Sequence, residues 1–582
     1  MAEQLIVKNL PFIKILPYWA QDLSYKYLSK TANLYILHGN ILDFLPHKME
    51  EGVFDFTKLQ SYISEVLFGN RDIIVYYDRS SGVSFCTPEM KKDYLQAIAK
   101  LIPDEEDYLT ADPTRAFVYL EKYFYHNLPA SRRIVLIIDY AETICPNSDL
   151  TRYSEEDRFC LVTLNRWAHD PIFTRGDVSI ILLTENLGDL STRLVRLPMT
   201  VKVNIPLPDE TVRRSFLDFL FRNKKLLLDT RLTTAEVAKV TSGLNLVNLN
   251  QLAAESYQEN RKISMDYLQQ KKKTLIEAEA IGLLEFIETE HTLKMVSGHE
   301  FVKKRFKNAA LAIKQGKLDV LPMGYLISGP VGTGKSFMVS AFAGEIGIPI
   351  VKFRNFRSKW QGVTEANLEK VLNILKAMSP VGVMIDEADA FLGDRNQEGD
   401  SGTSNRIFAQ IASFMGNTEY RGRIIWFLIT CRPDLLPIDL KRQGRAEEHL
   451  ALFYPETIEE KEDLFRTLVQ KLKLKIQKVN IIDLFRRYHF DFSGADLESI
   501  LIRAKFLAAM DNHVFITRDD LEITIRDFVP PSYPHEIELQ TLVAILECTS
   551  REMLPKKYQS IDRDSLGTEI KKLKQLLGEK AL

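Results

Sequence analysis

Short apolar runs alternate with longer amphipathic segments along most of this chain. Residues 133–139 and 178–184 in the first half, and residues 381–387 and 424–430 in the second half, are such runs. Runs of this length that are apolar almost throughout are typical of strands buried on both faces of a parallel sheet. Because helical segments separate them, the pattern predicts an α/β fold in three layers with a parallel sheet in the middle.

The two halves of the chain repeat the same order of features. In each half, two apolar strands are followed by a proline-containing turn, a helical run and a Ser-Gly motif, within residues 242–246 and 493–497. The segments that trail Pro208 and Pro455 show helical periodicity without strands, so each predicts a small helical lid. The sequence therefore predicts two related modules in tandem.

Composition excludes several classes of protein. The chain has 582 residues, 45% hydrophobic and 26% charged, with a formal net charge of -2, which argues against a nucleic-acid partner. Its five cysteines lack CxxC spacing, so neither a zinc site nor a disulfide framework is predicted. The opening residues predict no signal peptide and no run is long enough to span a membrane, so we expect a cytoplasmic protein without a membrane partner.

One glycine-rich segment carries the chemistry of phosphate binding. Residues 329–336 read Gly-Pro-Val-Gly-Thr-Gly-Lys-Ser. The glycines let backbone N–H groups close around phosphates, Lys335 supplies a positive charge, and the Ser336 hydroxyl can ligate Mg²⁺. The residues that we expect to bind nucleotide are Gly329, Pro330, Val331, Gly332, Thr333, Gly334, Lys335, Ser336, Phe337 and Asp386.

A pair of carboxylates ends the apolar run that follows this loop. Asp386 is expected to hold the metal together with Ser336, whereas Glu387 can polarise a water for attack on the γ-phosphate. ATP and Mg²⁺ are therefore the expected substrate and cofactor. Lys335 and Glu387 are the expected catalytic residues.

The first half lacks both motifs. Where a phosphate loop would fall, residues 35–43 have a lone glycine and no following lysine, so we do not expect tight triphosphate binding there. Asp139 ends a strand but is followed by Tyr140 where a water-polarising glutamate would stand. We interpret Asp139 as a strand-end carboxylate that caps a turn, and the first half as a catalytically inactive copy.

Residues 296–528 resemble the AAA module of the AAA+ superfamily. The resemblance rests on the phosphate loop, on Met-Ile-Asp-Glu-Ala-Asp at 384–389, on Arg-Gln-Gly-Arg at 442–445 and on Ser-Gly-Ala-Asp at 493–496. Residues 399–406 are similar to a segment of the uncharacterised AAA ATPases of cyanobacteria and plastid genomes, which also carry a degenerate N-terminal half. The resemblance implies tandem AAA+ modules, each with a three-layer parallel-sheet core of the phosphate-loop type followed by a small helical lid.

On this basis we predict five structural units. They are a degenerate AAA-like α/β domain without a phosphate loop at 1–207, a helical lid and linker at 208–285, an active AAA ATPase α/β domain at 286–455, a helical lid at 456–530 and a helical C-terminal tail at 531–582. The tail is amphipathic, and we expect it to pack on the lid or on a neighbouring subunit.

The resemblance also implies catalytic roles for Arg442 and Arg445, which fall where AAA proteins place arginine fingers. Such an arginine reaches across a subunit interface to a neighbour's γ-phosphate, and fingers contribute roughly 10³–10⁵ in rate in other phosphate-loop enzymes. The alternative is that both arginines cap a helix and pair with Glu447 or Glu448. Fingers that act in trans imply a homo-oligomeric ring, which the resemblance makes a hexamer.

Two further positions bear on how the module would be used. Trp360 stands where the family carries an aromatic pore-loop residue that grips an extended polypeptide, and the alternative is a core tryptophan. Cys431 stands where the family has an asparagine that orients the attacking water, and a thiol is a poorer hydrogen-bond donor than an amide. Thr430 could replace that asparagine, or hydrolysis could be slow.

Three functions compete on these grounds. The first is an ATP-driven ring that remodels or unfolds a protein client through a pore lined by Trp360. The second is a nucleotide-controlled assembly switch or scaffold with slow hydrolysis and no threading, which Cys431 favours. A nucleic-acid motor has the least support, because the chain has no basic domain and no interleaving of aromatic and basic residues.

Overall fold

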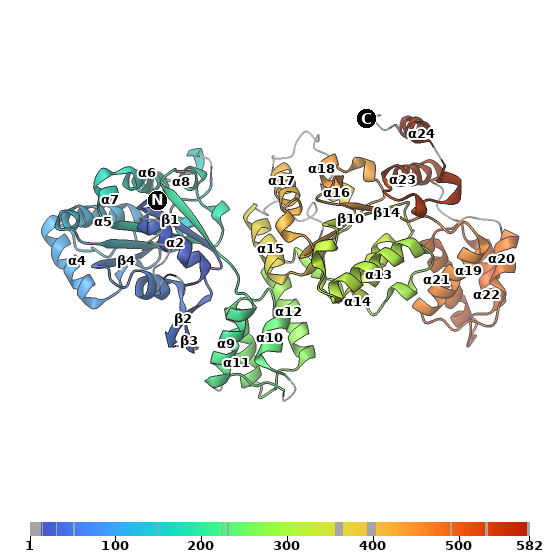
Figure 1. The fold of residues 1–582 in the computed structure, drawn as a ribbon, viewed down its shortest axis with the longest axis horizontal. Coiled ribbons are helices and arrows are strands. Elements are labelled where there is room, and N and C mark those ends of the chain that lie inside the picture. Colours follow the sequence, from blue (N-terminus) through green and yellow to red (C-terminus); the bar gives the residue numbers. More distant parts are fainter. Residues whose placement is uncertain are drawn as a thin grey trace. The chain divides into compact units, whose positions relative to one another are not determined.

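The computed structural model describes residues 13, 16–30, 32–50, 53–148, 150–223, 225–229, 232–354, 365–392, 403–488, 492–529, 533–560 and 562–578. The chain divides into two compact units, which are Met1–Ala280 with Val363–Ala377, and Ile281–Gly362 with Met378–Leu582. Each unit contains a six-stranded sheet flanked by helices (Figure 1).

The sheet of the first unit has the strand order β5-β4-β6-β7-β1-β8 and is parallel except at the β4–β5 edge. Alternate residues of its central strands enter two separate hydrophobic clusters, Ile36 and Leu136 in one and Tyr35 and Ile137 in the other. Both faces of the sheet are therefore buried, as long apolar runs require. The strands are β1 (Leu34–Gly39), β4 (Ile73–Asp78), β5 (Gly82–Phe85), β6 (Ile134–Ile138), β7 (Val178–Thr184) and β8 (Thr200–Ile205).

Helices cover both faces of this first sheet. The cluster around Ile36 includes residues of α4, α5 and α6, and the cluster around Tyr35 includes residues of α2. A separate antiparallel hairpin, β2 with β3, follows β1. The bounds are α2 (Tyr18–Leu28), α4 (Pro88–Leu101), α5 (Pro113–Asn127), α6 (Glu155–His169), α7 (Pro171–Arg175), α8 (Thr192–Val195), β2 (Phe44–Glu50) and β3 (Val53–Lys58).

The sheet of the second unit has the order β14-β10-β13-β12-β11-β9, again parallel except at the β11–β9 edge. On one face Phe427 packs with Phe306 of α13 and Phe342 of α14, and on the other Trp426 contacts Phe414 of α17. The strands are β9 (Leu284–Phe286), β10 (Gly324–Ser328), β11 (Ile350–Phe353), β12 (Val381–Ile385), β13 (Ile424–Ile429) and β14 (Glu448–Ala451). The helices are α13 (Glu300–Lys314), α14 (Lys335–Ile346), α16 (Ala388–Leu392), α17 (Thr403–Met415) and α18 (Ile438–Lys441). The helix between β11 and β12 in the chain, α15 (Glu365–Met378), belongs to the first unit up to Ala377.

The two sheets have the same strand order. The order β8-β1-β7-β6-β4 in the first repeats β14-β10-β13-β12-β11 in the second. The predicted α/β fold with tandem three-layer modules is confirmed. Each sheet also has a short antiparallel edge strand that the apolar pattern did not predict, because a strand of three or four residues is too short to show a period.

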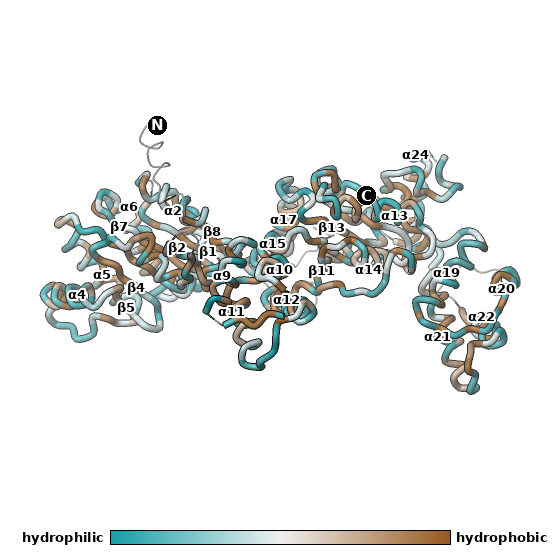
Figure 2. The backbone as a smooth tube through the Cα atoms, turned by 60° about the horizontal axis from the view of Figure 1, so that its bottom comes forward, coloured by the Kyte–Doolittle hydropathy of each residue, from teal (hydrophilic) through white to brown (hydrophobic). Residues whose placement is uncertain are grey.

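Within the described ranges, a set of four helices follows the last strand of each sheet, and in the second unit the C-terminal tail comes after that set. Hydrophobic colour runs along strands such as β1 and β13 (Figure 2). In both sets the third helix begins with a side-chain cap. Asn245 accepts from the N–H of Asn248, and Ser493 forms a capping box with Asp496. The helices are α9 (Glu210–Arg222), α10 (Thr234–Val240), α11 (Leu246–Gln258) and α12 (Met265–Glu279), then α19 (Ile458–Lys471), α20 (Ile481–Tyr488), α21 (Gly494–Met510) and α22 (Arg518–Asp527).

The C-terminal tail forms α23 (Pro534–Glu547) and α24 (Arg563–Leu576). It packs on the α/β domain of its own unit, where Ala544 meets Ala451 of β14 and the two helices enclose Phe453. The sequence predicts packing on the lid or on a neighbouring subunit instead. The amphipathic pattern indicates that a helix face is buried, but it does not indicate against which surface.

Across the described ranges, no helix has both the length and the apolar character needed to cross a membrane. The cytoplasmic location stays a prediction.

Candidate nucleotide site

The carboxyl ends of three neighbouring strands bring the predicted motifs of the second unit together. β10 leads into the phosphate loop, β12 into Asp386 and Glu387, and β13, which lies between them, into Thr430 and Cys431. Parallel pairing sets these ends at one edge of the sheet. In open α/β sheets, ligands bind outside this edge.

The conformation of the loop requires its glycines. Gly329, Gly332 and Gly334 have φ of 135°, 80° and 83°. A Cβ on Gly329 would lie 2.0 Å from the carbonyl oxygen of Leu452, and one on Gly332 would lie 2.6 Å from the hydroxyl oxygen of Ser493. Only a residue without a side chain fits both the backbone and the space.

The lysine of the loop begins α14 and turns back into the loop. Its buried ammonium donates to the carbonyl oxygens of Gly329 and Pro330, at 2.8 Å each. The first N–H groups of α14 lie beside this charge, and the amino end of a helix favours anions. The arrangement can therefore bind a polyphosphate.

The predicted metal ligands are neighbours. The Ser336 hydroxyl lies 3.1 Å from both carboxylate oxygens of Asp386. A hydroxyl and a carboxylate are oxygen donors, which Mg²⁺ prefers, so these residues fit the expected ion. The ammonium of Lys352, on β11, lies 2.9 Å from the same carboxylate.

Glu387 lies exposed immediately after Asp386, with a left-handed φ of 50°. Its backbone N–H donates to Asp386 Oδ1 at 3.2 Å, which fixes the turn between the two acids. Phe337 lies in the first turn of α14 and packs against His291 and Lys471. Its nucleotide contact stays a prediction.

The segment after β13 is held by polar contacts. The buried Thr430 hydroxyl donates to Asp389 Oδ1 at 2.6 Å and accepts from the N–H of Arg432 at 2.8 Å. Its proton is thus already donated to a carboxylate, which weakens the expectation that Thr430 replaces the family's asparagine. Cys431 between them is half-buried.

The two predicted finger arginines differ in exposure. The side chain of Arg442 is 61% exposed and lies 3.8 Å from Asp439. Arg445 is half-buried and donates to the carbonyl oxygen of Asp439 at 2.6 Å. Burial and the neighbouring Arg442 lower the pKa of Arg445.

The alternative pairing of these arginines is not seen within the described ranges. Glu447 pairs with Arg421 at 2.9 Å, and Glu448 lies 3.4 Å from Arg305. The finger role of Arg442 and Arg445 stays a prediction.

Two residues outside every sequence motif contact the phosphate loop and hold it in place. The N–H of Val331 donates to Gln540 Oε1 of α23 at 2.9 Å, and the Tyr454 hydroxyl donates to the Val331 carbonyl at 2.7 Å. Burial, with a smaller effect of Asp496, raises the pKa of Tyr454 to about 12, so this hydroxyl stays protonated. A glutamine or tyrosine in a helical or loop segment carries no motif that could have identified it.

The first unit builds a different loop at the equivalent strand end. Gly39 has φ of 98°, and a Cβ on it would lie 2.6 Å from the carbonyl oxygen of Ile205 of β8. Gly329 is in the same situation, because a Cβ on it would meet the carbonyl oxygen of Leu452, just after β14. Asp43 stands four residues after this glycine, as Thr333 does after Gly329. The chain then enters β2 where the second unit forms a helix.

The carboxylate of Asp43 sits at the amino end of α11. It accepts the N–H groups of Leu246 at 3.0 Å and Val247 at 2.9 Å, and the amide of Asn40 at 2.8 Å. Burial raises the pKa of Asp43, and these hydrogen bonds oppose the rise. An acidic side chain of the protein thus occupies the anion-binding end of the lid helix.

The other strand end of the first unit is also degenerate. Tyr140 has φ of 49° and stands where the second unit has Glu387. Asp139 accepts from the Tyr140 N–H at 3.1 Å and from Gln60 at 3.2 Å, which agrees with its interpretation as a turn cap.

Two predicted features lie outside the described residues. They are Trp360 and the first part of the segment 399–406, residues 399–402. The pore role of Trp360 therefore stays a prediction.

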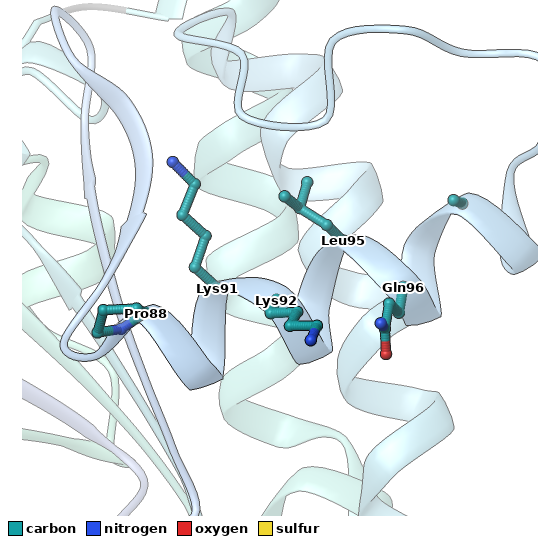
Figure 3. A pocket seen from close by; sticks show the side chains of 6 residues that line it. Pro88, Lys91, Lys92, Leu95 and Gln96 are labelled. Atoms are coloured by element: carbon teal, nitrogen blue, oxygen red, sulfur yellow. The ribbon is translucent and has the colours of Figure 1, made fainter.

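An open depression on α4 of the first unit is a weaker candidate for a site. Figure 3 shows Lys91 and Lys92 on this helix with Pro88, Leu95 and Gln96, and Ala99 completes the lining. These six residues include no carboxylate, thiol, hydroxyl or imidazole, and both lysines are exposed. The chemistry needed for catalysis is gathered at the phosphate loop instead.

A parallel sheet with a glycine loop after one central strand and an Asp-Glu pair after another defines a phosphate-loop nucleotide hydrolase. Residues 10–206 match the family model "AAA+ chaperone, N-terminal Rossmann-like domain", and residues 211–281 match "AAA+ chaperone, second helical domain". Residues 325–454 match "ATPase family associated with various cellular activities (AAA)".

Known proteins are also similar to this chain over parts of its length. The uncharacterized AAA domain-containing protein ycf46 of Trieres chinensis is 26% identical over 60% of this chain and 68% of the relative. The cell division cycle protein 48 homolog of Archaeoglobus fulgidus is 25% identical over 64% of this chain and 54% of its own length. The ATP-dependent zinc metalloprotease FTSH 6, chloroplastic, of Arabidopsis thaliana is 31% identical over 39% of this chain and 32% of its own length. By these matches the second unit carries an AAA ATPase domain, and two domains similar to those of AAA+ chaperones precede it.

Proposed function

We propose that the second module hydrolyses ATP within a ring of identical subunits and that this ring remodels a protein client. The observation that carries the proposal is the 61% exposure of the Arg442 side chain, on a subunit whose own loop, Asp386 and Glu387 are already assembled. An exposed guanidinium at this position suits a neighbour's γ-phosphate.

The chemistry can be assigned residue by residue. Lys335 and the loop N–H groups hold the phosphates, and Ser336 with Asp386 holds Mg²⁺. When bound, Mg²⁺ neutralises charge on the phosphate oxygens. Glu387 orients the attacking water and accepts its proton, and Arg442 of the neighbouring copy stabilises the negative charge that develops.

An apolar stripe on the lid supports self-association. Ile502, Phe506 and Met510 follow one another at four-residue spacing on α21 and are 51%, 68% and 64% exposed. Residues at this spacing share one face of a helix, and exposed apolar faces mark protein interfaces. We assign this stripe to the contact with the next subunit.

The first module is proposed to stabilise the ring or to recruit the client without binding nucleotide. The AAA+ chaperone descriptions of the models matched by residues 10–206 and 211–281 support a protein client. Asp43 supports the lack of nucleotide, because its carboxylate already takes the N–H groups at the start of α11.

A second candidate function is a nucleotide-controlled assembly switch that threads nothing. Cys431 and the engaged hydroxyl of Thr430 favour it, because neither offers a strong hydrogen-bond donor to an attacking water. Slow hydrolysis would then time the release of an assembled complex.

The variant Glu387→Gln tests the proposal. We expect it to bind ATP, to lose hydrolysis, and to accumulate as a ring in light scattering with ATP present. Tyr140→Phe, at the equivalent strand end of the first module, is the matched control and should behave as the parent. A Glu387→Gln protein that binds ATP but stays monomeric would contradict the ring.

The two functions separate at Trp360. In the remodelling ring, Trp360→Ala should abolish client-stimulated ATP hydrolysis while leaving basal hydrolysis intact. Unchanged stimulation would exclude threading and leave the assembly switch.

A further inference from the structure

We propose that Lys574, on the C-terminal helix α24, is a positioning residue for ATP hydrolysis. It acts through Asp434 and Arg432 on the segment that follows β13. The proposal rests on hydrolysis by the second module and requires neither the ring nor the client.

Three charged side chains form a buried cluster behind this segment. The Lys574 ammonium lies 2.7 Å from Asp434 Oδ2, and Asp434 accepts twice from the Arg432 guanidinium, at 3.0 and 2.9 Å. The Lys574 side chain is only 7% exposed. Burial raises the pKa of Asp434, but the hydrogen bonds from Arg432 and Lys574 outweigh it and hold this pKa below its usual value. The Asp434 carboxyl is therefore ionised at neutral pH.

A continuous series of contacts links this cluster to the catalytic edge of the sheet. The backbone N–H of Arg432 donates to the Thr430 hydroxyl, which donates to Asp389, two residues after Glu387. Cys431 lies between Thr430 and Arg432, so its backbone is held on both sides. A change at Lys574 reaches Asp389, two residues after Glu387, through four polar contacts.

Stability alone does not account for a lysine at this place. Leu566, Ile570 and Leu573 already bury the apolar face of α24. Removing an ammonium from water is costly, and apolar residues of similar volume often replace a buried ion pair without loss of stability. A directed charge at this point instead fixes one arrangement of Asp434 and Arg432.

The tail also contacts two other parts of the site. Gln540 of α23 accepts from the phosphate loop at Val331, and Glu547 pairs with Lys441, the residue before Arg442. The C-terminal helices thus contact the phosphate loop, the segment after β13 and the arginine segment within one unit. The contacts of Gln540 and Glu547 do not involve Lys574, Asp434 or Arg432, so they are separate evidence that the C-terminal helices contact the site.

The test is steady-state ATP hydrolysis by the full chain. Lys574→Met should lower kcat roughly tenfold and change KM for ATP by less than about twofold, because the contact concerns hydrolysis and not phosphate binding. Lys574→Arg should restore most of kcat. Lys572→Met, on the exposed face of the same helix, should match the parent.

A double-variant cycle shows whether Lys574 acts through Asp434. In an Asp434→Asn background, Lys574→Met should lower kcat no further. An unchanged kcat in Lys574→Met would overturn the proposal. So would a parallel loss of kcat, ATP affinity and melting temperature that Lys574→Arg does not rescue. Should Lys574→Met fail to fold, Asp434→Asn alone decides, since normal kcat in that variant also overturns it.

Discussion

After its first central strand, each module builds a different loop against the same part of its lid. In the second module Gly332 meets Ser493 at the start of α21, and the loop continues into the helix that carries Lys335. In the first module Asp43 binds the first N–H groups of α11, and the chain continues into a hairpin. The first module has placed the Asp43 carboxylate at this helix end, where the second module has the capping box of Ser493 and Asp496.

The contacts of Asp43 offer the first module a way to hold its lid without a nucleotide. A bound phosphate can connect a loop to the amino end of a lid helix, and the Asp43 carboxylate makes the same kind of connection permanently. Charge-assisted hydrogen bonds at a helix start contribute about 0.3–2 kcal/mol. The first lid is therefore fixed to its sheet independently of nucleotide.

The largest expected difference between the modules lies at their strand-end aspartates. Asp386→Asn should lower kcat for ATP by roughly 10² or more, because it removes a charged metal ligand. Asp139→Asn, at the equivalent place in the first module, should leave kcat unchanged. Steady-state hydrolysis of the two variants measures the difference, and a comparable loss in both would mean that the first module takes part in catalysis.

The next largest effect concerns the stability of the first unit. Asp43→Ala should cost about 1–3 kcal/mol, since it leaves the N–H groups of Leu246 and Val247 without their acceptor. Relief of the buried charge offsets part of this cost. Thermal unfolding of the first unit should shift down by several degrees relative to Asp55→Ala, a control on the exposed side of the neighbouring hairpin. Equal melting of the two variants would mean that Asp43 does not fix the lid.

A smaller effect is expected at Lys352. Its ammonium shares the Asp386 carboxylate with the metal site, and the paired registers of the strands put Tyr76 at the equivalent place in the first module. Lys352→Met should lower the Mg²⁺ concentration that gives half-maximal hydrolysis by about threefold, because a competing cation is removed. If Lys352→Met needs more Mg²⁺ than the parent, Lys352 supports metal binding and does not compete with it.

The smallest effect is a pH dependence. The pKa of Asp434 is lowered in the fold, so its contribution to stability is complete above the usual pKa of about 3.9 and is lost as the pH falls through the lower folded value. The difference in melting temperature between the parent and Asp434→Asn should therefore be constant from about pH 8 to pH 5 and shrink below about pH 4. A difference that changes near neutral pH would point to another group.

Sequence patterns predicted the parts of the molecule that depend on local order. The apolar runs at 133–139 and 424–430 became central strands because burial on both faces demands apolar residues throughout. The phosphate loop was predictable since its glycines are required by left-handed backbone and by close contacts with Leu452 and Ser493.

The contacts that sequence patterns could not predict join residues far apart in the chain. Lys352 is 34 residues from Asp386, and Gln540 is 209 residues from Val331. Lys574 lies among the lysines of an amphipathic tail, where a solvated position is the ordinary interpretation. Asp43 has no motif because its partners are backbone N–H groups of a helix about 200 residues later.

Mixing two inactive variants tests the central claim, which is that one site per subunit works with an arginine from the next. Arg442→Ala keeps Glu387 but lacks the exposed arginine, and Glu387→Gln keeps the arginine but lacks the acid. Each alone should be inactive, while random rings of equal amounts should recover about a quarter of the parent rate, since half the sites keep the acid and half of those have an arginine neighbour. An inactive mixture, or full activity of Arg442→Ala alone, would contradict the account.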